Sequence, residues 1–107
     1  MLDSASLRTA VDHLADRLRA LPQSRLRGDA AQAGLDLARE LAVEAQRLEH
    51  PGRTPRVMPD DGIFAVADQL AVAGHDLAAA LAARPERSDV LDDAVRKVAA
   101  TRRRAGV

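Results

Sequence analysis

Five prolines divide this sequence into segments that each show helical periodicity. Pro22 and Pro85 stand alone, whereas the other three lie together at positions 51, 55 and 59. Proline lacks a backbone N–H donor and disfavours helix in the residue before it, so these positions indicate helix boundaries. The pattern predicts helices over about 4–21, 24–49, 60–84 and 86–104, with a proline-rich loop at 50–59.

Apolar residues recur at helical spacing in every segment. In the first segment the apolar stripe is Leu7, Val11, Leu14, Leu18 and Leu21, with alternating steps of four and three. The chain has 23 Ala and 14 Leu but only nine Val, one Ile, one Phe and no Tyr or Trp. So few β-branched and aromatic side chains leave little from which to build the faces of a sheet. We therefore expect an all-α protein.

The lengths of the segments and their connections indicate how the helices are arranged. The short breaks at Pro22 and Pro85 join neighbours that run antiparallel. The sequence predicts a single domain, residues 1–107, folded as an up-down four-helix bundle with two long central antiparallel helices and two shorter terminal helices. Because shorter terminal helices would leave part of the central pair uncovered, this layout favours a partner protein.

Small residues form a second stripe on both central segments. An antiparallel hairpin closed by the loop would place Gly34 opposite Gly74. Facing small residues allow two helix axes to approach closely, which would offset the roughly 1 kcal/mol that a glycine inside a helix costs. The alternative is a chance coincidence of abundant alanines. The residues predicted to form this close packing are Gly34, Ala38, Ala42, Ala67, Ala71, Gly74 and Ala78.

The third helical segment has an unusual charge pattern. Between Val57 and Ala83 it contains four Asp but neither Lys nor Arg. Alanine and valine also lie opposite its main apolar stripe, and a helix that is apolar on nearly all sides is normally buried on more than one side. We expect either the last helix or a second subunit to cover this outer face.

Asp68 and His75 are seven residues apart and share one face of this segment, which makes them a possible polar pair. Such a pair can line a ligand pocket or transfer a proton, but chemistry normally needs a nucleophile or a further ligand nearby. No Glu is followed by His three residues later, as in helical di-metal bundles. The glycines form no phosphate-binding loop, and without Cys there is no thiolate site. The sequence therefore predicts no catalytic residue, no metal and no cofactor.

Two further segments are candidate binding surfaces. The proline-stiffened loop is predicted either to project from one end of the bundle as a docking site or to cap the core, through Arg53, Arg56, Val57 and Met58. The basic run Arg102–Arg104 suits nucleic acid or an acidic partner. Against nucleic acid, 16 basic and 16 acidic residues cancel, and aromatic side chains for base stacking are scarce. In addition, 15 of the 16 basic residues are Arg, a bias typical of a high-GC bacterial genome.

No motif in the sequence assigns a family or a reaction. The leading hypothesis is a non-catalytic helical interaction module that forms a homodimer or binds an unidentified protein partner. The second is a small regulatory or nucleic-acid-associated protein that uses its Arg-rich C-terminus. The third is a ligand-binding or enzymatic bundle centred on Asp68 and His75. No apolar run reaches the roughly 20 residues of a membrane span, so we expect a cytoplasmic protein without membrane contact.

Overall fold

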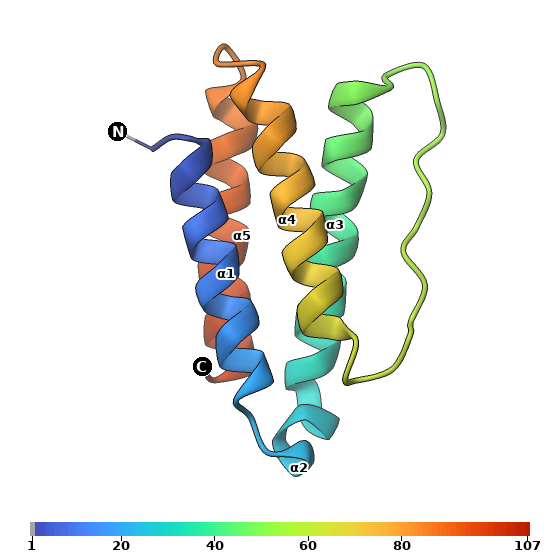
Figure 1. Cartoon of the computed structure of the whole chain (residues 1–107), viewed down its shortest axis with the longest axis vertical. Coiled ribbons are helices and arrows are strands. Elements are labelled where there is room, and N and C mark those ends of the chain that lie inside the picture. Colours follow the sequence, from blue (N-terminus) through green and yellow to red (C-terminus); the bar gives the residue numbers. More distant parts are fainter. Residues whose placement is uncertain (1) are drawn as a thin grey trace.

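The computed structural model describes residues 2–107, and every regular element in that range is a helix (Figure 1). The predicted all-α four-helix bundle is confirmed. A short helix, α2 (Gln23–Arg25), and a single π-helical turn (Leu26–Ala30) join the first two long helices. The four long helices are α1 (Ser4–Arg19), α3 (Ala31–Glu49), α4 (Val66–Ala82) and α5 (Ser88–Ala105).

The directions of the helices differ from the prediction, because α3 and α4 run parallel (Figure 1). Gly34, in the first turn of α3, lies against Val66, the first residue of α4. Ala45, in the last part of α3, borders the same groove as Asp76, in the second half of α4. The helices thus run down, up, up and down in chain order (Figure 1). The predicted antiparallel central pair is wrong.

The physical reason is the length of the connection after α3. The loop covers 50–65 instead of 50–59 and returns along the outside of α3 to the level where that helix began (Figure 1). Helix does not start at 60, because Gly62 has a left-handed φ of 95° and its amide donates to Asp60 Oδ1 at 2.9 Å. An extended loop of this length reaches roughly 50 Å, more than the ~28 Å length of α3, so it can join parallel helices.

The predicted difference in length between central and terminal helices is also wrong. The four long helices have 16, 19, 17 and 18 residues. The segment expected at 24–49 is interrupted at Gly28, whose φ of −70° and ψ of −134° are not helical. Contrary to the prediction, the helix lengths therefore leave no part of a longer central pair uncovered.

The packing order places α4 between α1 and α3, while α5 packs against the same two helices on the other side. The core between them is aliphatic, and no polar or charged residue of 2–107 is buried in it. The predicted stripe of α1 is buried at Leu7, Val11, Leu14 and Leu18. Across the part of the chain that is described, no helix combines the length and the apolar character that a membrane span requires.

Candidate functional site

The small residues of α3 and α4 lie at helix contacts, but their partners are not those predicted. A Cβ added at Gly74 would lie 2.7 Å from Cγ2 and 2.9 Å from Cβ of Val11 in α1. A Cβ added at Gly34 would lie 2.7 Å from Val66 Cγ1 and 3.0 Å from Leu18 Cδ1. Gly34 does not face Gly74, because parallel helices place the two glycines at different levels. Of the alanines in the predicted set, Ala38, Ala67 and Ala78 are buried, and Ala42 and Ala71 are partly buried.

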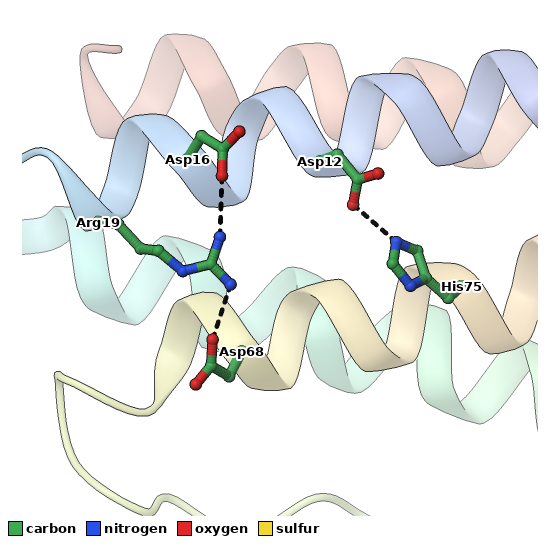
Figure 2. Close-up of polar contacts among 5 residues, drawn as sticks. All are labelled: Asp12, Asp16, Arg19, Asp68 and His75. Atoms are coloured by element: carbon green, nitrogen blue, oxygen red, sulfur yellow. Dashed lines mark hydrogen bonds and ion pairs between the residues drawn. The ribbon is translucent and has the colours of Figure 1, made fainter.

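Asp68 and His75 do not bond to each other, and each is instead paired with α1 (Figure 2). Arg19 donates from Nη2 to Asp68 Oδ1 at 2.7 Å and from Nη1 to Asp16 Oδ1 at 2.9 Å. His75 Nε2 lies 2.6 Å from Asp12 Oδ1. The hydrogen bond to Asp68 is the main reason that the pKa of Arg19 is raised. The predicted polar pair is thus replaced by two separate contacts along the line where α1 meets α4.

These contacts could not be read from the sequence, because they depend on which helix packs beside α4. Spacing along α4 correctly places Asp68 and His75 on one edge of that helix. It says nothing about Asp12, Asp16 and Arg19, which approach that edge from another helix. The contact between His75 and Asp12 is a single imidazole–carboxylate pair. Its side chains are partly exposed, the histidine to 34% and the aspartate to 45%.

The basic run at the C-terminus is partly neutralised within the chain. Arg104 donates to both oxygens of Asp29 at 2.6 and 2.9 Å and to Asp36 Oδ2 at 2.9 Å. The hydrogen bonds to these two carboxylates raise the pKa of Arg104, and the same bonds lower the pKa values of Asp29 and Asp36. Arg103 stays exposed, while Arg102 is half-buried. The run therefore presents less free positive charge to a nucleic acid than its sequence suggests.

The proline-rich loop lies along α3 and does not project from one end of the bundle (Figure 1). Gln46 holds it in place, because its side chain accepts from the Arg56 amide at 2.8 Å and donates to the Arg56 carbonyl at 2.9 Å. Arg39 Nε donates to the Met58 carbonyl at 2.8 Å. Met58 is partly buried against the core. Val57 is 67% exposed, and Arg53 is exposed as well. The predicted projecting docking site is wrong in its geometry.

Four large apolar side chains of residues 2–107 are exposed: Leu2, Val57 and two that lie on α4 or just before it. Phe64, just before the helix, is 71% exposed, and Val72 in its middle is 58% exposed. The last helix does not cover this side of α4, because α5 packs against α1 and α3. Of the two coverings that the sequence suggested, the last helix is therefore excluded. We call this surface the α4 outer face; it consists of Phe64, Asp68, Val72, Asp76, Ala79, Ala82 and Ala83, all exposed.

Among residues 2–107, no group of three His, Asp or Glu side chains is placed to hold a metal ion. The sequence matches no protein-family model, no curated protein and no solved structure. The α4 outer face is therefore the feature from which a function can be argued.

Proposed function

We propose that this chain is a non-catalytic protein-interaction module that self-associates through the α4 outer face. The observation that carries the proposal is the exposure of Val72 on α4 and of Phe64 just before it, while the other large apolar side chains of α4 are almost fully buried. Complete burial of such a side chain stabilises by about 1.5–3 kcal/mol, and much of this gain is missing in a single copy. Exposed apolar groups rimmed by polar residues are typical of interaction sites.

The character of the α4 outer face supports a second copy of the same chain as the partner. Its largest side chain, Phe64, lies at one end, and its smallest side chains, Ala79, Ala82 and Ala83, lie at the other. A face with a bulky end and a small end becomes complementary to itself when two copies meet in antiparallel orientation. The formal net charge of zero at pH 7 adds no net repulsion between copies.

Two valine substitutions test this proposal. Val72→Asp places a charge in the middle of the α4 outer face and should convert a dimer into a monomer in light scattering coupled to gel filtration. Val57→Asp is the matched control, because Val57 is also an exposed valine but lies on the loop. Val57 is 67% exposed and Val72 is 58% exposed. Val57→Asp lies outside the helices and should leave the melting temperature almost unchanged. Val72→Asp lies four residues from both Asp68 and Asp76, and these like-charge pairs should lower its melting temperature by several degrees while the fold is retained. A Val72→Asp protein with the same mass as the control would contradict the proposal.

A further inference from the structure

The α4 outer face has a centre and two unlike ends, which restricts how two copies can meet. Phe64 lies eight residues before Val72, and Ala79 and Ala82 lie seven and ten residues after it. At 1.5 Å per residue, each end is roughly 10–15 Å from Val72 along the helix. Phe64 borders a groove that also includes Leu18 and Arg19 of α1, so it lies on the α1 side of the face. At 100° per residue, Ala79 and Ala82 lie on that side as well.

From this layout we infer that two copies pack α4 against α4 in antiparallel orientation, about a two-fold axis that passes close to Val72. The inference rests on the proposed self-association and specifies its geometry. A two-fold axis places the same patch on both sides of the interface. At this position it sets Phe64 of each copy against Ala79 and Ala82 of the other, so that a large ring meets small side chains. Val72 then lies against Val72 of the second copy at the centre.

The charged groups beside Val72 fit the same axis. Asp68 lies four residues before Val72 and His75 lies three residues after it, both on the edge that meets α1 (Figure 2). Exchange of the two copies therefore brings Asp68 of one to the level of His75 of the other. The predicted polar pair, which does not form within one chain, would form between two chains.

Both groups have the bonding capacity that this contact needs. Asp68 uses only Oδ1 toward Arg19, and His75 uses only Nε2 toward Asp12. Within residues 2–107, Asp68 Oδ2 and His75 Nδ1 make no hydrogen bond. A protonated imidazole donates from both nitrogens, so His75 can join Asp12 of its own chain to Asp68 of the second copy.

The remaining acidic group of the face does not oppose this arrangement. Asp76 borders a groove with Ala42, Ala45 and Gln46 of α3, so it lies on the α3 side of Val72. Asp68 lies on the α1 side. The two-fold axis keeps the α1 sides of both copies together, and Asp76 of one copy is therefore turned away from Asp68 of the other.

Cysteine crosslinking tests the position of the axis, because the chain has no Cys of its own. A cysteine on the axis lies next to the equivalent cysteine of the second copy. The two can form a disulfide, because this bond needs Cα atoms about 4.4–6.8 Å apart. Under mild oxidation, Val72→Cys should give mostly covalent dimer on a non-reducing gel. Ala79→Cys is the matched control: it lies on the same face, but roughly 20 Å from its equivalent across the axis, and should stay monomeric on the gel. A mixture of Phe64→Cys and Ala82→Cys proteins should crosslink with each other.

The outcomes separate the register from the self-association itself. If the unmodified chain is dimeric in light scattering but Val72→Cys fails to crosslink, or Ala79→Cys crosslinks equally well, the proposed axis is wrong and self-association stands. If the unmodified chain is monomeric, both proposals fail. Crosslinking by Val72→Cys, with none by Ala79→Cys, supports both.

Discussion

Replacing Gly74 by Ala tests the contact between α1 and α4, because the added methyl group has no space. It would lie 2.7 and 2.9 Å from two carbon atoms of Val11, where carbon atoms normally stay about 3.5–4.0 Å apart. Val11 is fully buried, and its Cβ can move only together with the backbone of α1. Alanine gains about 1 kcal/mol in helix propensity, and overpacking costs about 1–3 kcal/mol. Because the clash includes the Cβ of Val11, which side-chain rotation cannot move, we place the overpacking cost near its upper limit. We therefore expect the free energy of unfolding to fall by about 1–2 kcal/mol.

Thermal unfolding followed by circular dichroism measures this loss. In a domain of this size, 1 kcal/mol corresponds to a change of about 4–8 °C in melting temperature, so Gly74→Ala should melt about 4–16 °C lower. Gly52→Ala is the control, since nothing lies within 4 Å of a Cβ added there. In the double variant with Val11→Ala, the clash is removed, and the combined loss should be smaller than the sum of the two single losses. A rise in melting temperature for Gly74→Ala would refute the close contact.

Two further predictions concern the polar contacts. Arg104→Gln removes the bonds that hold the pKa values of Asp29 and Asp36 below their ordinary 3.8. A carboxylate whose pKa is lower in the folded state stabilises the protein at every pH above its ordinary pKa. This stabilisation is lost as the pH falls from the ordinary pKa through the folded-state pKa. Between about pH 5 and pH 2, the melting temperature of the unmodified chain should therefore fall more steeply than that of Arg104→Gln, and parallel curves would contradict this. Gln46→Ala releases the loop at Arg56 and should speed tryptic cleavage after that residue. Gln32→Ala, which loses only a contact within α3, should not, and equal cleavage rates would argue against the clamp.

The parts of the fold that depend on local patterns could be predicted from the sequence. The stripe from Leu7 to Leu18 identifies the buried side of α1, because helical periodicity is a property of one segment. Proline positions likewise locate the breaks near residues 22, 51 and 85. The start of α4 was placed too early, because the turn at Asp60 and Gly62 depends on one side-chain bond and one left-handed residue. That error shortened the loop and reversed the direction inferred for α4.

Contacts between helices could not be predicted once that direction was wrong. Gly34 and Gly74 were correctly identified as sites of close approach, since a glycine inside a helix costs stability unless something compensates. Their partners, Val66 and Val11, follow from the packing order of the helices, which one sequence does not contain. The charge pattern of the segment before residue 83 singled out the outer side of α4, but it did not say that the last helix leaves this side exposed, because that depends on which helices α5 packs against.

The central claim is that the chain associates with itself, and sedimentation equilibrium of the unmodified protein tests it most directly. Measured from about 1 to 100 μM at neutral pH, a self-associating chain shows an average mass that rises with concentration. We predict a mass that approaches twice the 11.4 kDa of one chain. A mass that stays at 11.4 kDa up to about 100 μM would contradict the proposed function. It would mean that the free energy of dimerisation is weaker than about −5.5 kcal/mol, the value for a dissociation constant of about 100 μM.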